Sequence, residues 1–248
     1  MSEKLINAAL LSFGMSGRVF HAPFIELHPG FKLMGAWERS TKKIQNHYPN
    51  VKSYSSLEEI LADEEVELVV VNTPTYTHYE FAKKALQAGK HIVVEKAFTS
   101  NYEEAKELAN IAASKNLKIS IFQNRRWDSD FLTVKKVIQD GSLGDIVEAE
   151  FHYDRFNPDL SPKVHKETQN SGSGIVRDLA PHVLDQALSL FGMPQSVFAD
   201  LRKMRNNTLV EDYFEILLLY PSLRVRLKGG YFYKETVPSF QVFGTKGS

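Results

Sequence analysis

The stretch Leu5-Ile-Asn-Ala-Ala-Leu-Leu-Ser-Phe-Gly-Met-Ser-Gly17 decides the fold of the first half of this chain. It begins with a nearly unbroken apolar run, which is typical of a β-strand buried on both faces. Small residues follow at Ser12, Gly14 and Gly17, and a segment of helix length comes after them. A strand that passes through such a turn into a helix brings backbone N–H groups close to an anion.

The turn after this strand is compared with G-x-G-x-x-G, the pattern of a dinucleotide-binding turn. Two of the three glycines are present, and Ser12 stands at the first position. A plain strand–helix turn is the alternative. The context favours a nucleotide site, for which we expect the following residues to approach the pyrophosphate: Ser12, Phe13, Gly14, Met15, Ser16 and Gly17.

Composition narrows the class of protein. The chain has 248 residues, of which 43% are hydrophobic, so it can form one large or two ordinary domains with a core. Thirty basic and thirty acidic residues cancel, which gives no electrostatic signature of a nucleic-acid or membrane partner. There is no cysteine, no signal-peptide pattern and no apolar run of membrane-spanning length, so we expect a cytoplasmic protein.

The first half of the chain alternates apolar strand-like runs with helical segments. This alternation predicts an α/β fold with a doubly wound parallel sheet, a Rossmann domain over residues 1–123. The expected strands lie at 5–11, 31–37, 51–54, 66–71, 91–94 and 118–122.

The pattern changes after about Asn124. Residues 147–153 and 223–228 alternate apolar and polar side chains, which is typical of an antiparallel sheet with one covered face. Further strands are expected at 197–204, 213–220 and 240–243, with one helix over 175–191. The sequence therefore predicts an α+β domain over 124–248 with a mostly antiparallel open sheet.

Glu38 lies about twenty residues after the glycine turn, at the end of the second expected strand. An acidic side chain there can accept both hydroxyls of an adenosine ribose, which favours NAD. Arg39 and Ser40 follow at once and could instead hold the 2′-phosphate of NADP. The cofactor is therefore NAD or NADP, and Glu38 favours NAD. The alternative is that Glu38, Arg39 and Ser40 form an ordinary solvated strand end without a cofactor contact.

Two more polar groups end neighbouring strands. Asn72-Thr73-Pro74 follows the fourth strand, and Glu95-Lys96 follows the fifth. Ligands of an open α/β sheet bind at the carboxyl ends of its strands, so both groups are expected on the ligand-binding edge. Lys96 could equally be an ordinary surface lysine.

A second candidate site lies in the other half. Asp178 and His182 are four residues apart, so they share a face of the expected helix, and Asp185 is three residues further. They can form an acid–base pair, half of a metal site, or ordinary helix electrostatics. No H-E-x-x-H or equivalent spacing is present, so no metal site is predicted. Pro181 indicates that the helix proper starts late.

Taken together, these residues resemble the glucose–fructose oxidoreductase / inositol dehydrogenase (Gfo/Idh/MocA) family, and within it the branch of scyllo-inositol dehydrogenase-like proteins. The resemblance covers essentially the whole chain. It is carried by the turn at 12–17 and by Phe20-His21-Ala22-Pro23, Asn72-Thr73-Pro74 with His78, Ala88-Gly89-Lys90-His91 before Glu95-Lys96, Asn124-Arg125-Arg126-Trp127-Asp128, and Asp178-Leu179-Ala180-Pro181-His182 with Asp185.

The resemblance implies NAD(P)-dependent oxidation of a sugar or cyclitol hydroxyl, or the reverse reduction. Lys96, Asp178 and His182 fall on the family's catalytic positions. A neutral histidine can take the hydroxyl proton, a lysine can stabilise the developing alkoxide, and Asp178 can hydrogen-bond the sugar. The remaining residues expected at the cofactor are Asn72, Thr73, Pro74, His78, Glu95, Asn124 and Arg125.

The resemblance also implies a homo-oligomer formed through the open sheet face. Ala97 replaces the proline of the family's E-K-P motif, and family members continue beyond the position of Ser248, so we expect the second domain to be incomplete. Two other functions remain open. One is a dinucleotide-binding regulatory protein with weak or no turnover, and the other is a metal-dependent hydrolase built on Asp178 and His182.

Overall fold

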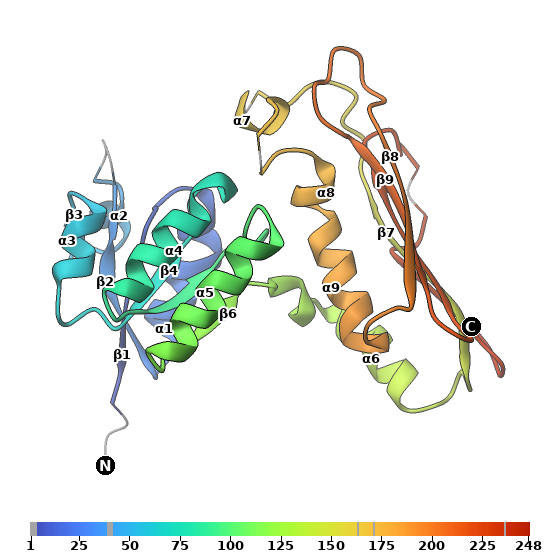
Figure 1. Cartoon of the computed structure of the whole chain (residues 1–248), viewed down its shortest axis with the longest axis horizontal. Helices are drawn as coiled ribbons and strands as arrows, with labels where there is room; N and C mark the ends of the chain where they lie inside the picture. Colours follow the sequence, from blue (N-terminus) through green and yellow to red (C-terminus); the bar gives the residue numbers. More distant parts are fainter. Residues whose placement is uncertain (1–3, 39–41, 163, 171, 236) are drawn as a thin grey trace. The chain divides into compact units, whose positions relative to one another are not determined.

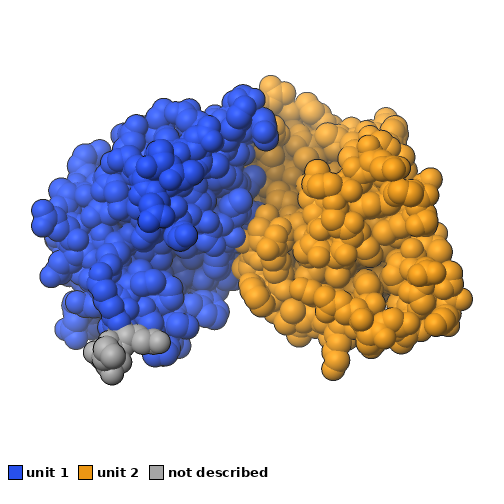
Figure 2. Space-filling view, turned by 60° about the horizontal axis from the view of Figure 1, so that its bottom comes forward, with its two compact units in different colours: residues 1–122 blue, residues 123–248 orange. Residues whose placement is uncertain are grey.

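The computed structural model describes residues 4–248 except 39–41, 163, 171 and 236. The chain divides into two compact units, Met1–Phe122 and Gln123–Ser248, which Figure 2 shows in different colours. The expected boundary lay after residue 123. Among the described residues, no helix combines the length and apolarity needed to cross a membrane.

The first unit holds a six-stranded sheet in the order β3-β2-β1-β4-β5-β6, with every pair of neighbours parallel (Figure 1). This is the predicted doubly wound sheet, and its strand order reverses between β1 and β4. Its strands are β1 (Ile6–Leu10), β2 (Phe31–Trp37), β3 (Lys52–Tyr54), β4 (Leu68–Val71), β5 (His91–Val94) and β6 (Ile119–Ile121).

Successive residues of the central strands pack against opposite faces of the sheet. Ala9 and Val69 belong to one core cluster with α3, α4 and α5, whereas Leu10 and Val70 belong to a second cluster with α1 and α2. This explains why the strands read as continuous apolar runs. The helices are α1 (Ala22–Leu27), α2 (Ile44–His47), α3 (Leu57–Ala62), α4 (His78–Gln87) and α5 (Tyr102–Ser114).

The first helix, α1, begins at Ala22 with Pro23 in its first turn. A π-helical turn, η1 (Gly17–His21), precedes α1, and the Ala22 N–H donates to the Gly17 carbonyl. Pro23 has no N–H and its ring clashes with a carbonyl four residues earlier in an α-helix. The wider π turn accommodates Pro23, and it leaves His21 buried.

The second unit holds a five-stranded sheet in the order β11-β7-β10-β9-β8. The predicted mostly antiparallel sheet is confirmed, with one difference: β7 and β10, both recognised from their alternation, pair in parallel. Alternation of apolar and polar side chains indicates that one face of a strand is covered. It does not indicate whether the neighbouring strand runs parallel or antiparallel. The strands are β7 (Ile146–Asp154), β8 (Ser196–Arg202), β9 (Tyr213–Leu219), β10 (Arg224–Gly230) and β11 (Phe240–Gly244).

One face of this sheet packs against a helix (Figure 1). Ala149 and Phe151 of β7 share a core cluster with Val183 and Ala187, which lie in α9. The helical elements of the unit are η3 (Asn124–Trp127), α6 (Ser129–Gln139), α7 (Val164–Glu167), α8 (Ile175–Asp178) and α9 (Ala180–Phe191).

Candidate active site

The turn between β1 and η1 is closed too tightly for a side chain at its last glycine. A Cβ built on Gly17 would lie 2.4 Å from the Ser12 carbonyl oxygen, closer than real Cβ contacts allow. A Cβ on Gly14 would meet only the Ser12 hydroxyl, at 3.4 Å. That hydroxyl accepts the Gly14 N–H at 3.2 Å, so Ser12 fits the first position of the glycine pattern by bracing the turn.

Asn72 holds this turn from the end of β4. Its Nδ2 donates to the Ser12 carbonyl at 2.8 Å and to the Ser16 hydroxyl at 3.4 Å, and the residue is 6% exposed. Its Oδ1 is buried with no hydrogen-bond partner among the described residues. Buried polar atoms are normally paired, so this acceptor is suited to a donor brought in by a ligand.

A cavity of about 290 Å³ opens at the carboxyl ends of β1, β2 and β4. Trp37 and Phe81 line it and pack edge to face with ring centroids 5.8 Å apart. Its other walls come from Leu11, Ser12, Phe13, Gly14, Glu38, Lys43, Thr73, Pro74, Tyr76 and Thr77. The volume is at the small end of ligand pockets and suits the adenosine part of a dinucleotide. The tight turn, the unpaired Asn72 acceptor and this cavity together fit the predicted cofactor.

Glu38 has a structural role in addition to the ribose contact that the sequence predicts. Its two carboxylate oxygens each accept one backbone N–H at 3.0 Å, from Lys43 and from Ile44. The carboxylate therefore ties the end of β2 to the start of α2, while it still lines the cavity. Arg39 and Ser40, the candidates for a 2′-phosphate contact, lie outside the described residues. Lys43, which the sequence reading missed, also lines the cavity.

Lys96 follows β5 at the same edge of the sheet, and both of its neighbours are held by buried histidines. His21 Nε2 lies 3.0 Å from a Glu95 carboxylate oxygen. His78 Nδ1 lies 2.8 Å from the Ala97 carbonyl oxygen, and its Nε2 lies 2.8 Å from that of Thr73. Burial lowers the pKa of His78, which the carbonyls of Thr73 and Ala97 partly oppose. His78, expected to contact the cofactor, therefore joins two strand ends.

In the second unit, the predicted single helix breaks at Leu179, whose φ is −112°, and Pro181 lies in the first turn of α9. Asp178 thus ends α8, whereas His182 begins α9, so the expected shared face of one helix is wrong. Asp178 Oδ2 accepts a hydrogen bond from Lys166 at 2.7 Å. The sequence did not predict this pair, because Lys166 lies 12 residues before Asp178 and belongs to no motif.

His182 is 6% exposed, and its ring stacks on Tyr153 of β7 with centroids 6.0 Å apart and planes 27° apart. The Arg125 guanidinium lies 5.1 Å from the centroid of the same tyrosine ring. Tyr153 was assigned only to the covered face of its strand, so its contact with a candidate catalytic residue was missed.

The Asn124–Trp127 turn that carries Arg125 is fixed on α9. Arg126 donates two hydrogen bonds to Asp185, at 2.6 and 2.7 Å, and Gln186 Nε2 donates to the Arg125 carbonyl at 3.0 Å. A bidentate pair of this kind sets orientation as well as proximity. Asp185, considered as a third member of an acid–base or metal group, therefore anchors this turn. Across the described ranges, no group of three His, Cys, Asp or Glu side chains could hold a metal ion.

Comparison with known proteins assigns both units. Residues 6–123 match the family described as "Oxidoreductase family, NAD-binding Rossmann fold", and residues 131–248 match the "GFO/IDH/MocA C-terminal domain". The chain belongs to the Gfo/Idh/MocA oxidoreductase family. The predicted family and the predicted Rossmann domain are thus confirmed.

Individual members of the Gfo/Idh/MocA family are similar over nearly the whole chain. An uncharacterized oxidoreductase of Schizosaccharomyces pombe is 45% identical over 98% of this chain and 70% of its own length. The scyllo-inositol 2-dehydrogenase (NADP(+)) IolW of Bacillus subtilis is 37% identical over 98% of this chain and 68% of its own. A crystal structure of a putative oxidoreductase from Bacteroides fragilis is 43% identical, with a TM-score of 0.88, and the match covers 98% of this chain and 69% of that one.

Proposed function

We propose that this protein transfers a hydride between a nicotinamide cofactor and the hydroxyl or keto carbon of a sugar or cyclitol. The observation that carries the proposal is that the Gly17 turn with its adjoining cavity and Lys96, which follows β5, both lie where strands of the first sheet have their carboxyl ends. The similarity to IolW, whose name states a scyllo-inositol substrate, supports a cyclitol as the first substrate to examine.

The proposed chemistry gives each residue one task. When bound, the nicotinamide ring supplies the hydride acceptor. His182 takes the hydroxyl proton, because a neutral imidazole is an efficient base near pH 7. Lys96 stabilises the negative charge that develops on the substrate oxygen, and Asp178, paired with Lys166, accepts a hydrogen bond from a neighbouring hydroxyl.

We further propose that NAD binds at least as tightly as NADP. The Glu38 oxygens keep lone pairs for ribose hydroxyls after accepting the Lys43 and Ile44 N–H groups, and a carboxylate disfavours a 2′-phosphate. Lys43, which also lines the cavity, favours NADP instead, because its positive charge attracts a 2′-phosphate. Fluorescence titration with NADH and NADPH measures the balance, and an NADPH Kd more than about tenfold lower would contradict this preference.

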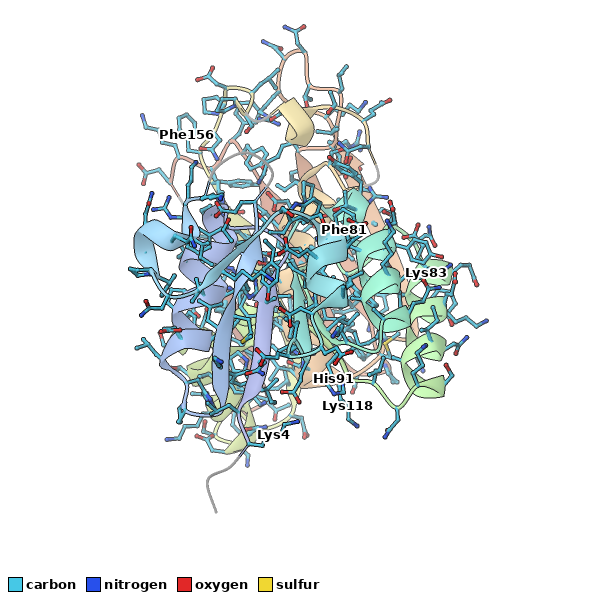
Figure 3. The ribbon with its side chains drawn as sticks, turned by 90° about the vertical axis from the view of Figure 1, so that its left-hand side faces the viewer. Lys4, Phe81, Lys83, His91, Lys118 and Phe156 are labelled. Atoms are coloured by element: carbon cyan, nitrogen blue, oxygen red, sulfur yellow. The ribbon has the colours of Figure 1, made fainter. Side chains whose placement is uncertain are left out.

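The activity test uses scyllo-inositol, myo-inositol and glucose with NAD⁺ and NADP⁺, followed by the absorbance of the reduced cofactor. We expect turnover with at least one cyclitol, and we expect Lys96→Met and His182→Gln each to lower kcat by about 10²-fold or more. Lys118→Met is the matched control, because Lys118 precedes β6 at the opposite end of the sheet (Figure 3).

The outcomes separate the alternatives. Cofactor binding without turnover on any substrate would support a regulatory protein of the same fold. Turnover that Lys96→Met leaves unchanged would show that the proposed chemistry is wrong. Loss of activity with a strong chelator would instead favour a metal-dependent reaction.

A further inference from the structure

Each residue beside Lys96 contacts a histidine from another segment of the first unit, Glu95 through its carboxylate and Ala97 through its carbonyl oxygen. His21 comes from η1, 74 residues before Glu95, and His78 begins α4, 19 residues before Ala97. Neither histidine is solvent-accessible: His21 is 3% exposed and His78 is 1% exposed. Buried polar groups are costly unless paired, so both contacts are fixed features of the fold.

The first histidine links Lys96 to the glycine turn. Gly17 begins the π-helical turn, and His21 ends it, so one five-residue element carries both. The His21 ring packs against Phe122 with centroids 4.2 Å apart, and its Nε2 meets the Glu95 carboxylate at 3.0 Å. The element that begins at Gly17 therefore contacts the residue before Lys96.

The second histidine links Lys96 to the same turn by another route. Asn72 hydrogen-bonds the Ser12 carbonyl, and the carbonyl oxygen of Thr73, the next residue, lies 2.8 Å from His78 Nε2. The other ring nitrogen of His78 meets the carbonyl of Ala97. The His78 ring thus spans the ends of β4 and β5.

We propose that His21 and His78 are positioning residues that fix Lys96 relative to the cofactor-binding turn. Neither needs to touch substrate or cofactor. Two separate connections, one to the residue before Lys96 and one to the residue after it, restrict the backbone that carries the ammonium group. Misplacing a reacting group by about 1 Å can lower a rate by about 10²-fold, so such restriction matters for the proposed chemistry.

The two histidines offer a matched test because they use different ring nitrogens toward Lys96. A glutamine amide can replace the Nε2 of histidine, and an asparagine amide can replace its Nδ1. His21 acts through Nε2, so His21→Gln keeps the contact with Glu95 and His21→Asn loses it. His78 reaches Ala97 through Nδ1, so here His78→Asn keeps the contact and His78→Gln loses it.

The first readout does not depend on turnover. Lysine amines of the full chain are methylated with ¹³C-formaldehyde, and the NMR signal of Lys96 is identified by its absence in Lys96→Arg. We expect His21→Asn and His78→Gln to move this signal toward that of exposed lysines, while His21→Gln and His78→Asn leave it in place. His91→Gln is the control, because His91 Nδ1 accepts the Lys118 N–H elsewhere in the same sheet (Figure 3).

The second readout rests on the proposed function. With scyllo-inositol and NAD⁺, the contact-losing variants should lower kcat by about 10²-fold, with the substrate KM within about threefold of wild type. A purely structural role would follow residue size and stability instead, so asparagine and glutamine would rank alike at both positions. That result, or an unmoved Lys96 signal in folded His21→Asn and His78→Gln, would overturn the proposal.

If the contact-losing variants do not fold, His21→Gln and His78→Asn decide the matter. A Lys96 signal at its wild-type position in both supports the proposal, and a displaced signal in either contradicts it. If no substrate is turned over, the proposed function fails while the NMR pattern still decides the positioning role.

Discussion

At the scale of single residues, the cofactor-binding turn distinguishes its two glycines by the space around them. A methyl group on Gly17 collides with the Ser12 backbone, whereas one on Gly14 makes ordinary contact with the Ser12 hydroxyl. The consensus pattern treats both glycines as equivalent. The structure shows that only Gly17 is required by steric contact with the main chain.

We therefore expect Gly17→Ala to weaken NADH binding by about tenfold or more, because the turn must open to admit the methyl group. Gly14→Ala should change the Kd by less than about threefold. Fluorescence titration of both variants checks this. Equal losses for the two variants would show that backbone flexibility, not the Ser12 contact, governs the turn.

Glu38 shows how a correctly placed residue can be used differently. The sequence put it at the end of the second strand, where the structure also has it. Its two carboxylate oxygens accept the N–H groups of Lys43 and Ile44, five and six residues further along the chain. No local pattern predicts these contacts.

At the scale of elements, two prolines mark where regular helix begins after an irregular stretch. Pro23 follows the π turn that buries His21, and Pro181 follows the break that separates Asp178 from His182. A proline in a helical pattern shows where regular hydrogen bonding is interrupted. The surrounding packing decides whether the chain forms a wider turn, as before Pro23, or two separate helices, as before Pro181.

The loops that support Asp178 are joined by a buried arginine. Arg205 donates to Asp212 at 2.9 Å, to Glu167 at 3.0 Å and to the Asp159 carbonyl at 2.9 Å. The side chains of Arg205 and Asp212 are 3% and 0% exposed. Glu167 follows Lys166, the partner of Asp178, so this cluster fixes the segment that carries the lysine.

We expect Arg205→Met to lower the free energy of unfolding of the second unit by about 3–5 kcal/mol, because it leaves the buried carboxylate of Asp212 and the mostly buried one of Glu167 without their cationic partner. Arg202→Met is the control, since the Arg202–Asp200 pair is also close, at 2.7 Å, but lies at the surface. Its loss should cost much less stability than the loss of Arg205, because water screens an exposed ion pair. Urea unfolding followed by circular dichroism measures both, and similar values would contradict a structural role for the buried cluster.

At the scale of the whole molecule, the two units are expected to respond to pH in opposite directions. Burial lowers the pKa of His78 in the first unit. In the second unit, Asp154 and then Glu150 raise the pKa of His152, although burial opposes them. A lowered histidine pKa costs stability as pH falls below the unfolded value of about 6.5, whereas a raised one contributes stability that is lost as pH rises.

We expect the stability difference between wild type and His152→Gln to shrink as pH rises from about 5.5 to 8, and that between wild type and His78→Gln to shrink as pH falls over this range. Differential scanning calorimetry of the three proteins at several pH values measures both differences. A pH-independent difference for either variant would show that its histidine keeps the same protonation when folded and unfolded.

The sequence predicted the order of strands and helices because each depends on a local pattern. Apolar runs marked the buried strands, and alternation marked the second sheet. The sequence also placed the glycine turn, Asn72 and Lys96 after strands of the first sheet. These residues lie at the same edge of the sheet because they follow strands that run parallel.

What the sequence determined by itself is thus the family, the doubly wound sheet and the sites where polar residues end strands. The tertiary structure alone decided the parallel pairing of β7 with β10, the second role of Glu38, and the histidines beside Lys96. The physical reason is the distance along the chain over which each effect acts. Secondary-structure propensity and hydrophobic periodicity depend on a few neighbouring residues. The partners of His21 and Arg205 lie 74 and 38 residues away, and only packing brings them within hydrogen-bonding distance.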